Sequence, residues 1–289
     1  MYPSAFDYHR AASVKDALKM LSEYGEDGKL LAGGHSLIPI MKLRLSQPAH
    51  LIDLGGVREL ATIREEGGKI VVGAMATHRA VQSSAIVRAK LGLLAECAAV
   101  IGDIQVRNRG TIGGSIAHAD PAADYPAAVL ALEGEITIEG AAGRRVVKAA
   151  DFFLDLMTTA VRPGEIVTQL AFAPIPAGRG FAYLKHRQPA SGFAMVGVAA
   201  VIALAKNAAC ESARVGITGL GAKPFRAKTV ESALAGKPPA RTIAAAAARA
   251  ADGIDALADI HASAEFRAEL ARVYTRRALE AALARAAAA

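Results

Sequence analysis

Apolar and polar positions in the first 175 residues alternate between short β-rich segments and segments with helical spacing. The clearest helical segment begins after Ser13, a good helix cap, and ends at Gly25. Its apolar residues recur every three or four positions on one face: Val14, Ala17, Leu18, Leu21 and Tyr24. The apolar run Lys29-Leu30-Leu31 then predicts a short strand that leads into a glycine-rich loop.

The same patterns predict the other elements of this part of the chain. They are a short helix that contains Pro39 and runs to about residue 45, strands over 51–54 and 69–74, a long helix over about 81–101, a helix over 127–132, a hairpin of 135–139 with 145–148, and a short helix capped by Asp151.

The pattern changes after residues 173–178, where proline and glycine cluster. Three β-rich runs follow over 180–187, 193–205 and 212–220, and two alanine-rich helices are expected over 240–257 and 263–286. Strands followed by helices predict a small α+β domain with a three-stranded antiparallel sheet. The apolar face of the last helix contains Phe266, Leu270, Val273 and Tyr274, and it either packs on this sheet or docks a partner.

Two glycine loops are the main candidates for chemistry. They read Ala32-Gly33-Gly34-His35-Ser36 and Thr111-Ile112-Gly113-Gly114-Ser115. Glycine lets backbone N–H groups approach a ligand closely, and small hydroxyl side chains donate hydrogen bonds to phosphate oxygens. Two such loops can hold one pyrophosphate, which predicts a dinucleotide site, most plausibly for FAD.

The spacing of these glycines excludes several common motifs. Neither loop has the G-x-G-x-x-G of a Rossmann domain, the chain has no G-x-x-x-x-G-K-[ST], and the serines lack the G-x-S-x-G context of a nucleophile. The stretch 216–221 runs G-x-x-G-x-G and does not open a helix. The two serines are therefore interpreted as hydrogen-bond donors, and no catalytic residue is assigned.

Composition narrows the function further. No apolar run is long enough to cross a membrane, and the N-terminus has no secretion signal. Cys97 and Cys210 cannot hold an iron–sulfur cluster and are interpreted as buried thiols of a cytoplasmic protein. The net charge of +7 comes from scattered residues with few aromatics, which does not favour nucleic-acid binding and suits docking to acidic partner subunits.

Several segments together resemble a known family. They are Tyr2–Arg10, Leu31–Leu45, Leu51–Leu54, Thr111–Ser115 and Asp120–Asp124, and they resemble the FAD-binding medium subunits of aerobic carbon monoxide dehydrogenase and of the wider molybdenum hydroxylases, which include xanthine dehydrogenase. The resemblance covers essentially the whole chain. It implies an α+β fold with a two-lobed FAD-binding domain like that of the vanillyl-alcohol oxidases over 1–176, with lobes of about 1–55 and 56–176, and a C-terminal flavoprotein domain over 177–289.

The resemblance also implies which residues bind the cofactor. It assigns two stretches to the FAD pyrophosphate and ribityl chain: Ala32, Gly33, Gly34, His35, Ser36 and Leu37, and Thr111, Ile112, Gly113, Gly114 and Ser115. Asp124 matches an acid that contacts the cofactor, and Lys185 matches a basic residue near the flavin ring. The chain has Gly192-Phe193 where the carbon monoxide dehydrogenase subunit has an Asp-Tyr pair. Phe193 can still stack on the ring but offers no hydroxyl.

The implied function is electron transfer within a larger enzyme. A large molybdenum–pterin subunit would oxidise the substrate, and a small subunit would pass electrons through two [2Fe–2S] clusters to the FAD of this chain. The implied assembly is a dimer of heterotrimers in the cytoplasm, with peripheral membrane association through the complex as an option. Two other classes stay open, namely a self-sufficient FAD-dependent oxidoreductase and a flavin-free scaffold subunit.

Other polar residues near the loops have two interpretations each. His118, Asp120 and Asp124 are expected to form a turn network and not a metal site, because only three candidate ligands lie together. His35 contacts the cofactor or points to a subunit interface. Three further residues are either helpers of the site or ordinary polar residues, namely Asp53, Arg107 and Arg109.

Overall fold

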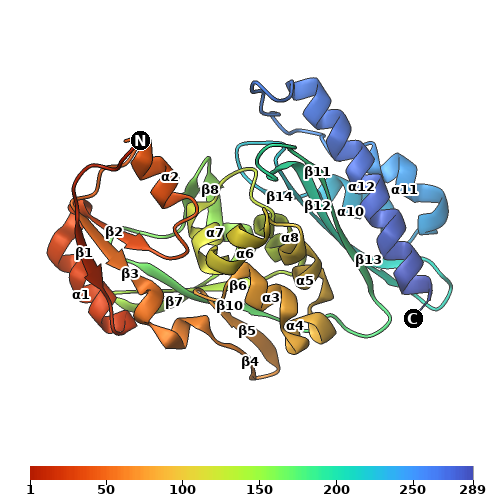
Figure 1. Cartoon of the computed structure of the whole chain (residues 1–289). Helices are drawn as coiled ribbons and strands as arrows, with labels where there is room; N and C mark the ends of the chain where they lie inside the picture. The colour runs from red at the N-terminus through yellow and green to blue at the C-terminus, as the bar shows by residue number, and fades with distance from the viewer. Residues whose placement is uncertain (289) are drawn as a thin grey trace.

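Three β-sheets of three or more strands follow one another along the computed structural model, which describes residues 1–288 and also contains a two-stranded sheet (Figure 1). The first is a small parallel sheet of order β1-β3-β2 at the N-terminal end of the molecule. Its elements are β1 (Asp7–Arg10), α1 (Val14–Tyr24), β2 (Gly28–Leu31), α2 (Leu37–Lys42) and β3 (His50–Asp53). As predicted, Ser13 caps α1 by accepting a hydrogen bond from the Asp16 N–H, and Gly25 ends the helix.

The second sheet is antiparallel, with the order β4-β5-β10-β6-β7. Its strands are β4 (Ile63–Glu66), β5 (Lys69–Gly73), β6 (Glu135–Gly140), β7 (Gly143–Lys148) and β10 (Ile166–Phe172). Between β5 and β6 the chain forms α3 (His78–Ser83), α4 (Ala85–Lys90), α5 (Gly92–Ala99), α6 (Ile104–Arg109), α7 (Ile112–His118) and α8 (Tyr125–Ala131). The short α9 (Ala149–Phe152) and the hairpin of β8 (Phe153–Asp155) and β9 (Thr158–Thr159) precede β10.

The third sheet forms the C-terminal domain and has four antiparallel strands. They are β11 (Gly180–Arg187), β12 (Ala194–Leu204), β13 (Cys210–Thr218) and β14 (Phe225–Arg226). Helices α10 (Lys228–Leu234), α11 (Pro239–Ala247) and α12 (Ala264–Ala287) cover one face of the sheet (Figure 1). The opposite face packs against α5 and α8 of the preceding part of the chain.

Burial on both faces explains the long apolar run that becomes β12. Val196 and Val198 pack with the C-terminal helices, whereas Ala199 and Val201 belong to the core beneath the second sheet. Successive side chains of a strand point to opposite faces, so a strand covered on both sides is apolar throughout. Gly216 on β13 has no side chain because a Cβ there would overlap the carbonyl oxygen of Ala127 on α8. The stretch 216–221 thus serves interdomain packing.

Several predicted elements are wrong in extent. The long helix over 81–101 is three short ones, because Ser84 caps a new helix through the Val87 N–H and the backbone leaves helical geometry at Leu91. The first alanine-rich helix, predicted over 240–257, ends at Ala247, and Asp151 lies inside α9, whose cap position is Lys148. The C-terminal sheet has four strands and not three, because the two-residue edge strand β14 is too short to leave a pattern.

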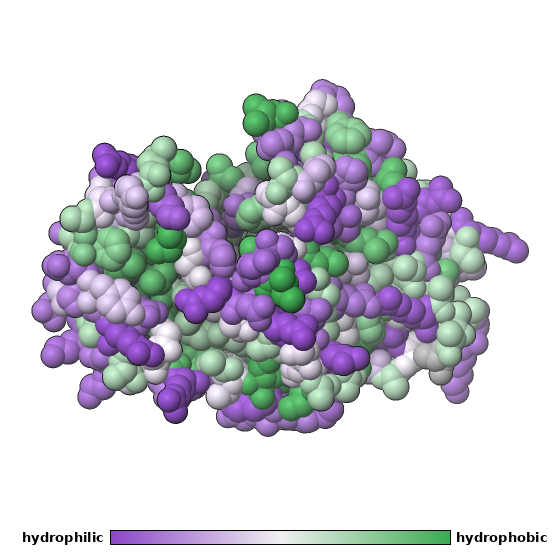
Figure 2. All heavy atoms as spheres, viewed as in Figure 1, coloured by the Kyte–Doolittle hydropathy of each residue, from purple (hydrophilic) through white to green (hydrophobic). Residues whose placement is uncertain are grey.

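The last helix packs on its own sheet, through a face that includes the predicted Leu270 but is shifted from the predicted one. Phe266 is 47% exposed, while Arg267, Leu270 and Ala271 are buried. In the part of the chain that the structure describes, no helix is long and apolar enough to span a bilayer. The face seen in Figure 2 mixes hydrophilic and hydrophobic residues, with a notch in the outline between the N-terminal part and the C-terminal domain.

Candidate functional site

The first glycine loop connects β2 to α2 and lines a groove of about 490 Å³. Gly34 has a φ of +78°, in the left-handed region that favours glycine. Within residues 1–288, the backbone N–H groups of residues 33–36 donate to no protein acceptor. The Ser36 hydroxyl likewise makes no capping bond at the start of α2. The loop therefore presents a row of unused donors to the groove.

The second glycine loop is the first turn of α7, and its donors are already engaged. The Thr111 hydroxyl oxygen caps the helix by accepting from the Gly114 N–H at 3.1 Å. The N–H groups of Ile112 and Gly113 donate to the carbonyls of Ala76 and Ala74, at 3.0 and 2.8 Å. What this loop can still offer a ligand is the hydroxyl protons of Thr111 and Ser115.

The two glycine loops lie against each other. A Cβ on Gly33 would overlap the carbonyl oxygen of Arg109 and lie 2.7 Å from the Cα of Gly110. A Cβ on Gly114 would lie 3.5 Å from the Cβ of Ala32. The absence of side chains at these positions brings the loops into contact.

The lining of the groove favours an anion. Lys42 and Arg109 contribute two positive charges, and the one carboxylate, Asp53, is already engaged with the Tyr8 hydroxyl at 2.5 Å and the Gly55 N–H at 2.8 Å. The free N–H row, the Ser36 hydroxyl and this charge balance fit a diphosphate. The complete lining is Leu31, Ala32, Gly33, Gly34, His35, Ile38, Pro39, Lys42, Asp53 and Arg109.

Sequence reasoning overlooked Lys42 and Ile38 as lining residues. A signal was available, because Gly34, Ile38 and Lys42 are spaced by four and therefore lie on one side of α2 and its entry. Arg109 and Asp53 line the groove and are not remote surface charges. Arg107 points elsewhere, donating to the carbonyls of Ile101 and Gly102.

Asp124 and Lys185 are brought together, but in a buried pair and not in the lining of this groove. The Lys185 Nζ lies 2.8 Å from Asp124 Oδ1, and the two side chains are 5% and 3% exposed. Burial raises the pKa of the Asp124 carboxyl, and Lys185 and the Tyr183 hydroxyl oppose that rise. Asp124 lies at the start of α8 and Lys185 on β11, so the pair joins the second sheet's helices to the C-terminal domain.

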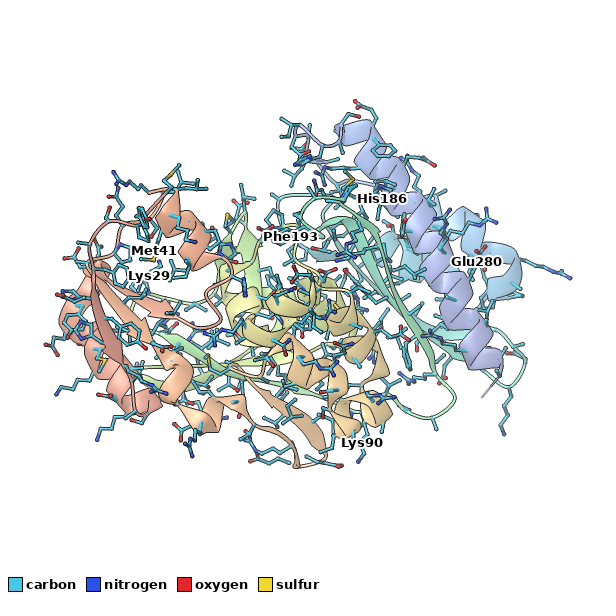
Figure 3. The ribbon with its side chains drawn as sticks, in the orientation of Figure 1. Lys29, Met41, Lys90, His186, Phe193 and Glu280 are labelled. Atoms are coloured by element: carbon cyan, nitrogen blue, oxygen red, sulfur yellow. The ribbon has the colours of Figure 1, made fainter. Side chains whose placement is uncertain are left out.

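Phe193 is 44% exposed at the end of a turn that precedes β12. Figure 3 shows it at the edge of the C-terminal domain that faces the N-terminal part, where Met41 lies. Asp120 forms a turn network by accepting from the Ala122 N–H at 2.8 Å. Among residues 1–288, no three His, Cys, Asp or Glu side chains are grouped to hold a metal ion.

His78 packs against Gly110, the residue before the second loop. The backbone N–H of His78 donates to the Gly110 carbonyl at 2.9 Å, and the imidazole ring lies where a Gly110 side chain would be. Burial, followed by the nearby charges of His35 and Arg107, lowers the pKa of His78 to about 4. The imidazole is therefore neutral at physiological pH.

Comparison with known proteins decides the family. Residues 4–174 match the model of the FAD binding domain in molybdopterin dehydrogenase, and residues 181–282 match the CO dehydrogenase flavoprotein C-terminal domain. The chain belongs to this family of flavoproteins. The resemblance described from the sequence is thus confirmed, and so is FAD as the cofactor of the family.

Whole-chain relatives support this assignment. The carbon monoxide dehydrogenase medium chain of Hydrogenophaga pseudoflava is 42% identical over 288 residues, which cover 99% of this chain and 100% of that one. The 6-hydroxypseudooxynicotine dehydrogenase complex subunit alpha of Paenarthrobacter nicotinovorans is 36% identical, covering 99% and 97%. A solved structure of carbon monoxide dehydrogenase from Hydrogenophaga pseudoflava superimposes with a TM-score of 0.95 over 99% of both chains, at 42% identity.

Proposed function

We propose that this chain is the FAD subunit of a molybdenum hydroxylase like carbon monoxide dehydrogenase, and that it transfers electrons from the [2Fe–2S] clusters of a partner to an external acceptor. The observation that carries the proposal is the row of unused N–H donors in a positively charged groove, within a chain of this family. Bound FAD supplies the ability to take up electrons singly and release them in pairs.

The chain's own residues would hold the cofactor in two ways. The N–H groups of residues 33–36 and the Ser36 hydroxyl would donate to the pyrophosphate, with Lys42 and Arg109 adding positive charge. The hydroxyl protons of Thr111 and Ser115 would donate from the second loop, while Ala32, Leu37, Ile112, Gly113 and Gly114 shape the contact between the loops. Phe193 would contribute a flat apolar surface for the flavin ring.

The partners follow from what the chain lacks and from its relatives. Its two cysteines are both buried and cannot ligate a cluster that needs four thiolates. Medium chains are by name one component of a larger enzyme, as in the relative from Hydrogenophaga pseudoflava. We therefore assign a large molybdenum–pterin subunit and a small iron–sulfur subunit as partners, in a cytoplasmic dimer of heterotrimers.

Substrate choice would belong to the molybdenum subunit. Relatives named for carbon monoxide and for 6-hydroxypseudooxynicotine are 42% and 36% identical to this chain over nearly its whole length. Different substrates in the names thus accompany one flavoprotein architecture.

The test is the visible absorption spectrum of the purified chain, alone and co-expressed with the partner genes, before and after heat release of the flavin. We expect one non-covalent FAD per chain, and reduction of that FAD by the hydroxylase substrate only when both partners are present. Absence of flavin from the chain and from the complex would contradict the proposal. Direct oxidation of a small substrate by the isolated chain would instead indicate a self-sufficient flavoenzyme.

A further inference from the structure

The end of α2 exposes two leucines beside the cofactor groove. Leu43, where the helix ends, is 57% exposed, and Leu45 is 77% exposed. Lys42, the residue before Leu43, lines the groove. An apolar surface therefore lies at the rim of the candidate site, and no part of the chain that the structure describes covers it.

The N-terminal segment extends this surface. In Figure 1 the N-terminus lies beside α2, and the Ser4 hydroxyl donates to the side-chain oxygen of Gln47 at 2.6 Å. Tyr2, two residues before Ser4, is 86% exposed. We define the α2 patch as Tyr2, Leu43, Arg44 and Leu45.

The backbone at the end of α2 adopts a conformation that usually requires glycine. The Leu45 N–H donates to the Ile40 carbonyl at 3.1 Å, and the Arg44 N–H donates to the Met41 carbonyl at 3.0 Å. This pair of bonds requires a left-handed residue between helix and loop, and Arg44 has a φ of +59°. The residue that follows frequently packs back on the helix in such an ending, but Leu45 is instead the more exposed of the two leucines.

Contacts among residues 1–288 do not offset the strain at Arg44. A side chain in the left-handed region costs free energy relative to glycine. The Arg44 guanidinium is exposed and takes part in no ion pair and no hydrogen bond with the described residues. The chain thus places a cation and a leucine outward at a cost in stability, which a contact with another molecule would compensate.

The charge around the α2 patch indicates what would cover it. Residues 1–6 and 28–52 contain no Asp or Glu, whereas Lys42 and Arg44 are both exposed. Asp53, the next carboxylate along the chain, already accepts two hydrogen bonds. A surface with an apolar centre and a rim of carboxylates would complement this one.

The α2 patch fits a protein better than a lipid bilayer. The helix has six residues, which is short for a helix that lies in the plane of a membrane interface. Clusters that bind anionic lipids contain about four to eight Lys or Arg, whereas the patch and Lys42 together supply two cations. Tyrosine and arginine are enriched in protein interfaces, and both are present in the patch.

We propose that the α2 patch docks an acidic protein subunit of the assembled enzyme at the rim of the cofactor groove. The two leucines and Tyr2 would fill the centre of the interface, and Arg44 would pair with a carboxylate of the partner. This inference rests on the proposed function, because it gives a docking surface to the subunits with which the chain is proposed to assemble.

Arg44→Gly separates the chain's own stability from its assembly. Glycine removes the strain of the positive φ, so the melting temperature of the isolated chain should rise by about 2 °C. The same change removes the cation, so the dissociation constant of the complex with the co-expressed partner subunits should increase about tenfold. Mass photometry of the diluted complex measures that constant. A lower melting temperature of the isolated chain would overturn the proposal, because Arg44 would then serve the fold.

Ala208→Gly is the matched control for this change. Ala208 is also exposed and has a φ of +61°, but it lies in the turn between β12 and β13. The melting temperature should again rise, while the dissociation constant of the complex should change by less than about twofold. An equal loss of affinity in Arg44→Gly and Ala208→Gly would contradict a role for the α2 patch.

Leu45→Ser tests the apolar centre of the interface. Leu45 is exposed in the chain, so the melting temperature should change little, but the complex should dissociate about tenfold more readily. Val146→Ser on β7 removes another exposed apolar side chain, 57% exposed, and should leave the affinity unchanged. Both variants should retain FAD, since neither residue lines the groove.

The outcomes distinguish this proposal from the proposed function. If the wild-type chain forms no complex with the partner subunits, both fail. If the complex forms and Arg44→Gly and Leu45→Ser bind the partners like the wild type, only the docking surface is wrong. Sedimentation with vesicles of equal parts phosphatidylglycerol and phosphatidylcholine tests a membrane instead. Vesicle binding that is lost in Leu45→Ser, with unchanged affinity for the partners, would overturn docking of a protein.

Discussion

The two glycine loops have similar sequences but use their backbones differently. The loop of residues 32–37 leaves the N–H groups of residues 33–36 free and lines an open groove. In the loop of residues 111–115, backbone N–H groups donate to the carbonyls of Ala74 and Ala76 and to the Thr111 hydroxyl oxygen. This loop is the buried start of a helix. A glycine pair next to a hydroxyl therefore leaves free backbone donors at a groove in one case and allows close packing of the fold in the other.

The difference follows from what precedes each loop. The first loop leaves the end of a parallel strand, and parallel strands commonly end at ligand sites. The second loop follows α6 and runs beside residues 74–77, the segment between β5 and α3, where the isolated bridge between Thr77 and Thr111 holds it to the fold. We therefore expect the first loop to supply backbone donors and the second to supply hydroxyl protons and the surface on which the first one rests.

The largest expected effect is that of Gly33→Ala. The new Cβ overlaps the Arg109 carbonyl, a backbone atom that cannot rotate away, so the loops must separate. We expect about 1–3 kcal/mol of destabilisation and loss of bound FAD, measured by urea unfolding and by the flavin-to-protein absorbance ratio.

Gly216→Ala is the matched control for this change. Its Cβ would overlap the Ala127 carbonyl in the same way, and neither residue lines the groove. It should cost comparable stability while the folded protein keeps its FAD. Equal flavin content in the two variants would show that contact between the loops is not what FAD requires.

The second expected effect is a pH dependence of stability caused by His78, which packs against Gly110 at the entry to the second loop. His78 has a pKa of about 4 in the folded protein against 6.5 when unfolded. As the pH falls below 6.5, His78 becomes protonated in the unfolded chain but stays neutral in the folded chain. The free energy of unfolding therefore decreases until the pH reaches about 4. Between pH 7.5 and pH 5 we expect a loss of about 2 kcal/mol from this residue.

The measurement compares urea unfolding of the wild type and of His78→Gln at both pH values, since other titrating groups contribute equally to both proteins. The variant should lose about 2 kcal/mol less than the wild type over this interval. A parallel pH dependence in the two proteins would contradict the neutral, buried state of His78.

Thr111→Val tests the capping role of the Thr111 hydroxyl at the start of α7. The substitution keeps the shape and removes the oxygen that accepts from the Gly114 N–H, which should destabilise the fold by about 1 kcal/mol. Thr111→Ser restores both the acceptor and the hydroxyl proton. In calorimetry, the serine variant should have nearly the melting temperature of the wild type. A valine variant that melts at the wild-type temperature would refute the capping role.

The smallest effect is expected from the exposed charges of the groove. Lys42→Gln should weaken FAD binding by about 0.5–1 kcal/mol at low salt, and less at high salt, because exposed charges are screened. Titration of the apoprotein at two ionic strengths measures this. Lys29→Gln, an exposed lysine on β2 that does not line the groove, is the control and should show no such change.

Local sequence signals predicted much of the fold. The cap at Ser13, the end of α1 at Gly25 and the hairpin of β6 and β7 were correct because each depends on residues close in sequence. The break at Ser84 was overlooked although its cap is local. The break at Leu91, the short β14 and the full buried face of α12 were missed because tertiary packing sets them. Phe266 fits the helical period but lies at the rim, and Arg267 is buried because its guanidinium bonds the carbonyls of Met195 and Gly219.

The sequence indicated the two glycine loops, but it did not indicate which of them has free N–H donors. Gly33 lies against the backbone of Arg109 and Gly110, and Gly114 lies near Ala32, so the two loops are in contact. Which N–H groups are free depends on the carbonyls of Ala74 and Ala76, some forty residues earlier in the chain and invisible to a motif. The buried pair of Asp124 and Lys185 was likewise not predictable, because the two residues are far apart in the sequence and only the fold brings them together.

The central claim is that backbone donors come from the first loop. Amide hydrogen exchange, resolved by residue and measured with and without added FAD, tests it most directly. We predict that the N–H groups of residues 33–36 exchange rapidly in the free chain and become protected when FAD binds, while those of Ile112 and Gly113 are protected in both states. FAD-dependent protection of the second loop with no change at residues 33–36 would contradict this account.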